Sequence, residues 1–267
     1  MHDHKAPLTL ARIRELLAGT AVDPLLLEAL RGDPRASVAA LLRSAERRED
    51  KRVKARSHRE GMLSIERELA AAGCVWPAGV DEAGLGPLAG PVVAAAVILG
   101  EAADIEGIDD SKKLDPARRA RLDIEIRARA RAWSVGIAEV EEIDRLNVYH
   151  AGLLAMRRAV EGLTEKPDHV LVDARRIPGL DVPQSAYIKG DARSLSIAAA
   201  SIVAKTHRDA LMKRLDLQYP GYGLARHKGY GTAEHQDAIR RLGASPVHRT
   251  SYEAVRVLVA EGRSSGG

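Results

Sequence analysis

The stretch GVDEAGLGPLAGPVVAAAVIL, residues 79–99, decides the fold. Its second half, from Val92 to Leu99, is a short apolar run with β-branched residues, which is typical of a buried strand. The glycines and prolines before that run predict a tight turn, so the whole stretch predicts a β-hairpin. Asp81 and Glu82 stand close to the turn. Because an ionised acid buried without a partner costs several kcal/mol, we expect a cation beside this pair.

The turn also contains a sequence that imitates a nucleotide-binding motif. Gly84 to Ala89 fits G-x-G-x-x-G/A, the dinucleotide fingerprint. That motif must open a helix whose N-terminus holds the pyrophosphate. Here Pro91 and the apolar run favour a strand, and the two acids would repel a phosphate unless a metal lay between them. The hairpin is therefore preferred over a dinucleotide site.

The composition allows a full hydrophobic core and contains no membrane segment. The chain has 267 residues, 45% of them hydrophobic, which is enough for one large domain and a small one. No run approaches the ~18 apolar residues of a membrane helix, and the N-terminus lacks the apolar region of a signal peptide. The single Cys74 excludes an internal disulfide, and the nine histidines lack zinc-site spacing. We expect a soluble cytoplasmic protein that does not bind membranes.

Residues 8–73 have a helical pattern of their own. Helix starts are predicted at Thr9, Asp23-Pro24 and Asp33-Pro34, where a capping side chain or a first-turn proline stands. Between residues 43 and 59 there are eight Lys or Arg and three acids. This segment is either a solvated connector or an arm that contacts phosphates. We therefore predict a helical N-terminal extension with a charged connecting helix (1–73), a main domain (74–258) and a disordered tail (259–267).

After the hairpin, the pattern alternates between strands and helices. Helices are predicted at 117–130, capped by Asp115 with Pro116 in the first turn, at 141–163, after Ser194 and at 233–242. Strands are predicted at 133–140, 170–173 and 185–188, and loops at 221–232 and 246–249. Three antiparallel strands followed by strands that alternate with helices indicate a mixed α/β sheet.

Acids stand at or just after the ends of predicted strands, at Asp81, Glu82, Asp173 and Asp191. If the hairpin and the 170–173 strand are neighbours, these carboxylates converge, and two such charges about 4 Å apart repel by ~4 kcal/mol at an effective dielectric near 20. Oxygen ligands without His or Cys select Mg²⁺ or Mn²⁺ rather than zinc. A pair of such ions about 3.5–4 Å apart assists in-line phosphoryl displacement. The expected chemistry is phosphodiester hydrolysis, although acids at strand ends also serve as loop caps.

Residues near the acids fit a nucleic-acid substrate. Ser111 and Lys112 offer a hydroxyl and a positive charge to a phosphate, and Lys189 stands close to Asp191. Each of these is equally well explained as a solvated loop residue. Tyr230, between two glycines, is suited to stack on a sugar or base, or to pack beneath its own loop.

Several blocks of sequence share the order and spacing of one family. They are GVDEAGLGPLAGPV (79–92), DDSKKL (109–114), RLN (145–147), LVD (171–173), KGD (189–191), SIAAASIVAK (196–205), RD (208–209), HKGYGT (227–232) and HR (248–249). Through these blocks the chain resembles bacterial ribonuclease HII across about residues 76–255. The resemblance implies a ribonuclease H-like fold, with a mixed five-stranded sheet flanked by helices.

The resemblance also implies an activity. The four acids would be catalytic residues and ligands of two Mn²⁺ or Mg²⁺ ions. The expected enzyme is an endoribonuclease that cuts on the 5′ side of a ribonucleotide, in an RNA/DNA hybrid or embedded in duplex DNA, and leaves 3′-hydroxyl and 5′-phosphate ends. Such an enzyme removes ribonucleotides from DNA. The substrate-binding positions implied by the resemblance are Gly84, Gly86, Ser111, Lys112, Asn147, Lys189 and Tyr230.

Two further features follow from the resemblance. Tyr230 matches the family tyrosine that packs against the sugar after the ribonucleotide, and the helical extension is similar to one associated with holding substrate in some members. One position departs from the pattern, because Leu85 stands where the family has an Arg or Lys that helps recognise the RNA–DNA junction. We therefore expect cleavage with weaker junction affinity, by a monomer. The alternatives are a ribonuclease HIII-like enzyme that prefers long hybrids and a nucleic-acid-binding protein without catalysis.

Overall fold

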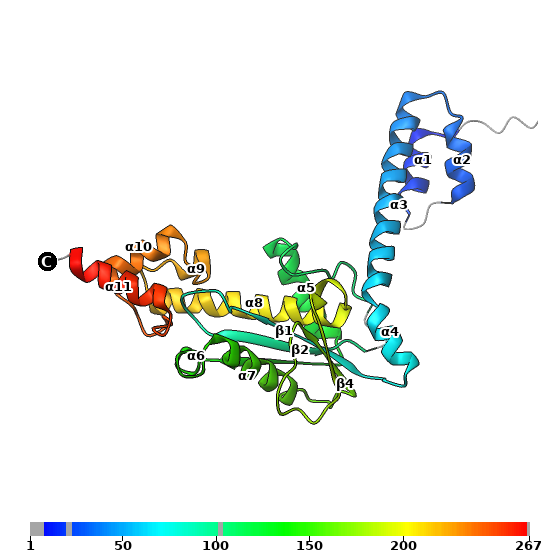
Figure 1. Ribbon diagram of the computed structural model, residues 1–267. Coiled ribbons are helices and arrows are strands. Elements are labelled where there is room, and N and C mark those ends of the chain that lie inside the picture. Colours follow the sequence, from blue (N-terminus) through cyan, green and yellow to red (C-terminus); the bar gives the residue numbers. More distant parts are fainter. Residues whose placement is uncertain (1–7, 20–22, 101–103, 266–267) are drawn as a thin grey trace, which may run out of the picture. The chain divides into compact units, whose positions relative to one another are not determined.

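The computed structural model describes residues 8–19, 23–100 and 104–265 (Figure 1). The chain divides into two compact units, Met1–Glu60 and Gly61–Gly267, each of which is described by itself. The helices among the described residues are α1 (Leu10–Leu17), α2 (Pro24–Arg31), α3 (Ala36–Met62), α4 (Ser64–Ala71), α5 (Pro116–Arg129), α6 (Val140–Leu146), α7 (Val148–Glu161), α8 (Leu195–Gln218), α9 (Leu224–His227), α10 (Ala233–Leu242) and α11 (Glu253–Ser265). Each of them is too short or too polar to cross a membrane.

The first unit is a small helical body with its own core. Thr9 caps α1 by accepting a hydrogen bond from Arg12 N, and Asp23 caps α2, as the sequence predicts. The third predicted start is wrong by two residues: Asp33 accepts from the backbone of Arg35, and α3 begins at Ala36. The apolar faces of these helices pack together in a core formed by Ile13, Leu17, Leu30, Val38, Leu42 and Ala45.

The last helix of the predicted N-terminal extension belongs to the second unit. The helical pattern that starts at Asp33-Pro34 breaks at Leu63, between α3 and α4. Glu66 of α4 accepts hydrogen bonds from Ser194 Oγ at 2.6 Å and from Ser196 N at 3.0 Å. Because α4 is bonded to the start of α8 in this way, the two units divide between Glu60 and Gly61, whereas the predicted boundary was after residue 73.

The second unit is built on the mixed five-stranded sheet that the sequence predicts. Its strand order is β3-β2-β1-β4-β5. The predicted hairpin is confirmed, because β1 pairs antiparallel with β2, which pairs antiparallel with β3, whereas β1 and β4 are parallel, as are β4 and β5. The strands are β1 (Pro77–Ala83), β2 (Val92–Ile98), β3 (Ala132–Ala138), β4 (His169–Asp173) and β5 (Gln184–Tyr187).

Helices α8 and α7 cover opposite faces of this sheet (Figure 1). Alternate residues of β2 point to the two sides: Ala95 and Val97 pack in the core that contains α8, and Ala94 and Ala96 pack in the core that contains α7. Glycine allows both helices to approach closely. A Cβ atom on Gly79 would lie 2.0 Å from the Ser196 carbonyl carbon, so no other residue fits between β1 and α8.

Several element boundaries differ from the prediction. The predicted helix 141–163 is two helices, because Asn147 has a φ of 69° and separates α6 from α7. The strand predicted to reach residue 140 ends at Ala138, since α6 begins at Val140. Within the predicted loop 221–232, residues 224–227 form the short α9. Residues 259–265 of the predicted tail are helical, because the apolar side of α11 packs through Val255 and Leu258 against Leu88. Residues 266 and 267 lie outside the described residues.

Candidate active site

The register of the sheet brings predicted acids to adjacent strand ends. Strands β1 and β4 are parallel, and Val80 pairs with Val172, so Asp81 and Asp173 are the next residues along neighbouring strands. Gly190 N donates a 2.7 Å hydrogen bond to Asp173 Oδ1, and this bond holds the following residue, Asp191, close to the end of β4. Acids that are far apart in the sequence thus meet at one edge of the sheet.

Burial makes the ionised state of these acids unfavourable. Burial and the neighbouring Glu82 raise the pKa of Asp81 well above its ordinary value, although a hydrogen bond from Ser201 opposes the rise. Burial also raises the pKa of Glu82, and Asp173 adds to that effect. Burial raises the pKa of Asp173 as well, and the charge of Asp191 raises it further. Positive charge that enters the site therefore stabilises the ionised acids.

Two side chains of the protein provide part of that charge. Lys112 Nζ lies 3.2 Å from Asp191 Oδ2, and the lysine side chain is 76% exposed. Arg175 Nη1 lies 3.7 Å from Glu82 Oε1, which is too long for a hydrogen bond. Arg175 Nη1 and Glu82 Oε2 are both buried without a hydrogen-bond partner. The carboxylates are thus only partly neutralised.

The donor atoms fit a hard divalent cation. The acids offer only oxygen ligands, which Mg²⁺ and Mn²⁺ prefer, and Glu82 Oε2 is a buried acceptor with no partner. Within residues 8–19, 23–100 and 104–265, no group of three or more His, Cys, Asp or Glu already has the arrangement that holds a metal ion. The donor atoms therefore meet the chemical requirement for such a cation.

A cleft of about 240 Å³ lies beside the acids and collects most of the predicted site residues. Tyr230 is 46% exposed there, and a Cβ atom on Gly86 would lie 3.8 Å from its ring. Asp191 is not among the lining residues and reaches the cleft through its contact with Lys112. The predicted site residues that line the cleft are Asp81, Glu82, Gly84, Gly86, Ser111, Lys112, Asp173 and Tyr230.

Two predicted substrate-binding residues lie elsewhere. Asn147 caps α7, because its side chain accepts a 3.1 Å hydrogen bond from His150 N, and it lines a separate pocket with Asp144 and Tyr252. Lys189 is exposed in the turn before residues 190–192, with a φ of 56°. Neither side chain lines the cleft that contains the acids.

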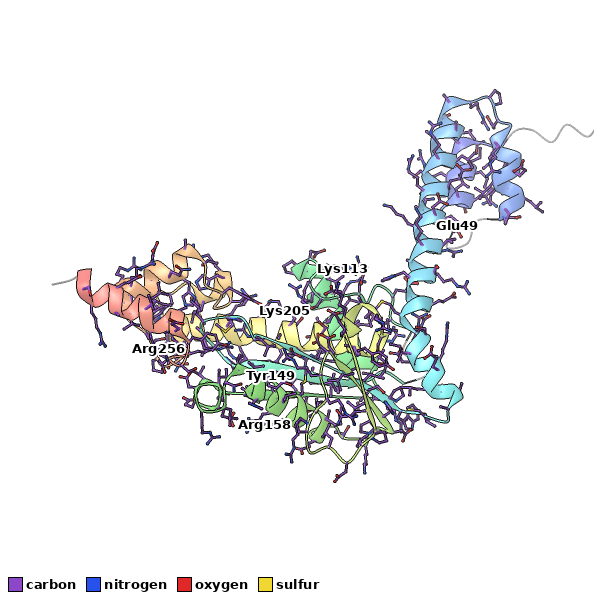
Figure 2. All side chains as sticks on the ribbon, viewed as in Figure 1. Glu49, Lys113, Tyr149, Arg158, Lys205 and Arg256 are labelled. Atoms are coloured by element: carbon purple, nitrogen blue, oxygen red, sulfur yellow. The ribbon has the colours of Figure 1, made fainter. Side chains whose placement is uncertain are left out.

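One face of α8 contributes site residues that the sequence analysis did not select. Ser201, Lys205 and Arg208 line the cleft, and Lys205 is labelled on α8 in Figure 2. Ser201 Oγ lies 2.8 Å from Ser111 Oγ, so α8 and the loop before α5 meet at this point. The spacing of the three residues, i, i+4 and i+7, is the pattern that would have identified them as one polar face of a helix.

Two buried arginines hold the glycine turn, residues 84–91, that forms a wall of the cleft. Arg249 is fully buried; it donates to four carbonyls of the turn and to the hydroxyl of Tyr252. Arg208 donates from its three nitrogens to the carbonyls of Pro91, Ala89 and Lys228. Burial and the charge of Arg249 lower the pKa of Arg208 to about 10. The carbonyls bound by Arg249 are those of Gly84, Leu85, Pro87 and Gly90.

Comparison with known proteins agrees with this geometry. The family model "Ribonuclease HII" matches residues 78–255, and the model "Ribonuclease HII N-terminal domain" matches residues 9–70. Ribonuclease HII of Myxococcus xanthus is 56% identical over 244 residues, covering 91% of this chain and 83% of the relative. That of Geobacillus kaustophilus is 51% identical over 248 residues, covering 93% and 95%.

A solved structure supports the same assignment. The crystal structure of ribonuclease H2 from Pyrococcus horikoshii superposes with a TM-score of 0.60 at 27% identity, covering 70% of this chain and 99% of that one. The family match spans the sheet, the acids and the cleft, and its companion spans the N-terminal helices. The chain therefore belongs to the ribonuclease HII family and is a ribonuclease H-type endonuclease.

Proposed function

We propose that the cleft hydrolyses the phosphodiester bond on the 5′ side of a ribonucleotide, in an RNA/DNA hybrid or embedded in duplex DNA. The products are 3′-hydroxyl and 5′-phosphate ends, and the biological result is removal of ribonucleotides from DNA. The observation that carries this proposal is the set of partly neutralised carboxylates at adjacent strand ends, beside a cleft that also presents lysines and an exposed tyrosine.

The four acids, Asp81, Glu82, Asp173 and Asp191, are proposed as the ligands of divalent cations. Two bound Mg²⁺ or Mn²⁺ ions would supply positive charge to the attacking and leaving oxygens of the phosphate. The positions of the four acids would determine where the bound ions lie relative to the glycine turn. This role explains why so many acids with raised pKa values gather in one buried place.

The other cleft residues are proposed to hold the substrate. Lys112 and Lys205 attract phosphates, and Ser111 offers a hydroxyl to a phosphate oxygen. Gly84 and Gly86 let the backbone approach the ribose 2′-hydroxyl, the group that distinguishes RNA from DNA.

Tyr230 is proposed to pack against the sugar that follows the ribonucleotide. Asn147 and Lys189 are proposed contacts for substrate that extends past the cleft. We propose that the monomer is the active form.

A cleavage assay tests the proposal. A DNA duplex with a single ribonucleotide is incubated with the protein in Mn²⁺, in Mg²⁺ and in EDTA, and the cut is mapped. We expect one cut on the 5′ side of the ribonucleotide with either metal and none in EDTA. The Asp81→Asn variant should lose the activity, and the control Asp237→Asn, at an exposed carboxylate of α10, should keep it.

Two results would overturn parts of the proposal. An intact duplex after incubation with Mn²⁺ would refute the proposed cleavage and leave the alternative of a nucleic-acid-binding protein without catalysis. Efficient cleavage of a long RNA/DNA hybrid, with no cleavage of the single-ribonucleotide duplex, would assign the preference of a ribonuclease HIII-like enzyme instead.

A further inference from the structure

A group of histidine side chains lies behind the loop that carries Tyr230. His235 is fully buried and His248 is 1% exposed. Their Nε2 atoms are 3.1 Å apart, and His227 stacks on His235 with ring centroids 4.4 Å apart. None of these rings lines the cleft. They are therefore buried polar groups for which the proposed reaction gives no role.

The hydrogen bonds of the two buried rings fix their tautomers. Ser245 N donates to His248 Nδ1 at 3.0 Å, so in the neutral ring the proton of His248 is on Nε2. His248 Nε2–H then donates to His235 Nε2, which leaves the proton of His235 on Nδ1. His235 Nδ1–H donates to the Tyr230 carbonyl oxygen at 3.0 Å. We call this one-directional chain from Ser245 through His248 and His235 to Tyr230 the histidine relay.

The relay requires neutral rings, and its surroundings keep them neutral. Protonation of His235 at Nε2 would place two N–H groups face to face and break the central bond, and protonation of His248 at Nδ1 would set its N–H against that of Ser245. Burial lowers the pKa of both His235 and His248 to about 4. The other titratable side chains in contact with the relay are His227, stacked on His235, and Tyr222, whose ring is 4.7 Å from that of His248.

The relay connects the two walls of the cleft. At one end, Gly90 N donates to Val247 O at 2.8 Å and Arg249 N donates to Leu88 O at 2.9 Å, so the segment with His248 is bonded to the glycine turn. At the other end is the backbone of Tyr230, whose ring faces Gly86 of the same turn. The relay thus holds the tyrosine at a defined distance from the turn.

We propose that His235 and His248 are positioning residues that set substrate affinity by holding the backbone of Tyr230 through the histidine relay. This inference rests on the proposed function, in which Tyr230 packs against the substrate sugar. Because the relay touches neither the acids nor the cleft surface, its loss should raise KM and leave kcat nearly unchanged.

Steady-state kinetics on the single-ribonucleotide duplex test the inference. His248→Phe keeps a ring and removes the hydrogen bonds to His235 and Ser245. We expect KM to rise about tenfold, with kcat within about twofold. His248→Gln places an amide donor near the position of Nε2 and should restore KM to within about threefold. His150→Phe, at an exposed histidine of α7, is the control and should leave both constants unchanged.

A second variant separates this inference from the proposed function. Tyr230→Ala should raise KM at least as much as His248→Phe. If Tyr230→Ala raises KM and His248→Phe does not, the relay has no positioning role, whereas the sugar contact stands. If Tyr230→Ala has no effect, the proposed sugar contact fails and the positioning role fails with it.

An NMR measurement on the wild-type protein tests the relay without relying on activity or on the folding of a variant. Long-range ¹⁵N–¹H correlation of the histidine rings near pH 7 should show His248 as the Nε2–H tautomer and His235 as the Nδ1–H tautomer. The opposite tautomer at His235 would leave the Tyr230 carbonyl without this donor and would overturn the inference.

Discussion

Replacing Arg249 by lysine should test how the glycine turn is held. The guanidinium bonds to four backbone carbonyls of the turn, those of Gly84, Leu85, Pro87 and Gly90. Lysine keeps the positive charge, but its three N–H donors radiate from one nitrogen and do not reproduce the planar fork of arginine. Arg249→Lys therefore separates the geometry of the hydrogen bonds from the charge.

The number of carbonyls gives the size of the effect. The Tyr252 hydroxyl also donates to Leu85 O, so that carbonyl keeps a partner in the variant. The three donors of an ammonium do not match the spacing of the arginine fork, and we expect two of the other three carbonyls to be left without a partner. A buried carbonyl without a partner costs ~1–3 kcal/mol. We expect the free energy of unfolding to fall by about 2–6 kcal/mol, which is a large part of the roughly 5–15 kcal/mol that is typical of a domain.

Urea unfolding followed by tryptophan fluorescence measures this change. Both tryptophans, Trp76 and Trp133, belong to the second unit, so the signal reports on the unit that contains Arg249. The midpoint should fall by about 1 M urea, and KM for the duplex should rise because Gly84 and Gly86 lie in the turn. Arg241→Lys, at an exposed arginine of α10, is the control. A loss below about 0.5 kcal/mol, with an unchanged KM, would refute the reasoning.

Three further predictions concern other parts of the second unit. Leu85 lines the cleft, so Leu85→Arg should place a cation beside the substrate and lower KM for a single-ribonucleotide duplex about fivefold, and an unchanged KM would contradict this. The pKa values of His235 and His248 fall to about 4 on folding, so between pH 6.5 and pH 4 the unfolded chain binds protons that the native protein does not. As the pH falls through this window, the free energy of unfolding should therefore drop by up to about 3 kcal/mol for each ring. Urea titrations of wild type and His248→Gln should diverge in that window, and parallel curves would argue against it. Burial and Glu82 raise the pKa of Asp81, which means that its ionised form is unfavourable in the folded protein. Asp81→Asn removes that charge, so it should increase the melting temperature in EDTA and abolish the stabilisation by Mn²⁺. A lower melting temperature of the variant in EDTA is the opposing result.

Local patterns predicted the frame of the second unit because they depend on neighbouring residues. The apolar run and the turn chemistry of residues 79–99 identified the hairpin, and the apolar run before Asp173 identified β4. With these two strands as neighbours, the meeting of Asp81 and Asp173 followed from the geometry of a sheet. The family resemblance supplied what the pattern could not, namely the number of strands in the sheet and the expected activity.

Other features depend on contacts between distant residues and could not be predicted in this way. Arg249 belongs to a quoted motif, but nothing local shows that its guanidinium reaches four carbonyls of residues 84–90. Ser201 was assigned only to a helix with small residues, and its position beside Ser111 became visible in the folded chain. The break at Asn147 was also missed, because one residue with a positive φ inside a helical pattern leaves no periodic sign.

The glycine contact between β1 and α8 determines where this protein can change shape. Gly79 stands two residues before Asp81, and the backbone of α8 packs directly against it. The strand that carries Asp81 and Glu82 is therefore held rigidly against this helix. Duplexes of different width or bend must then be accommodated by exposed side chains of the loops around the cleft, such as Lys112 and Tyr230. Evolution and protein engineering should therefore find new substrate preferences in those loops, whereas even a methyl group added at residue 79 should disturb catalysis for every substrate alike.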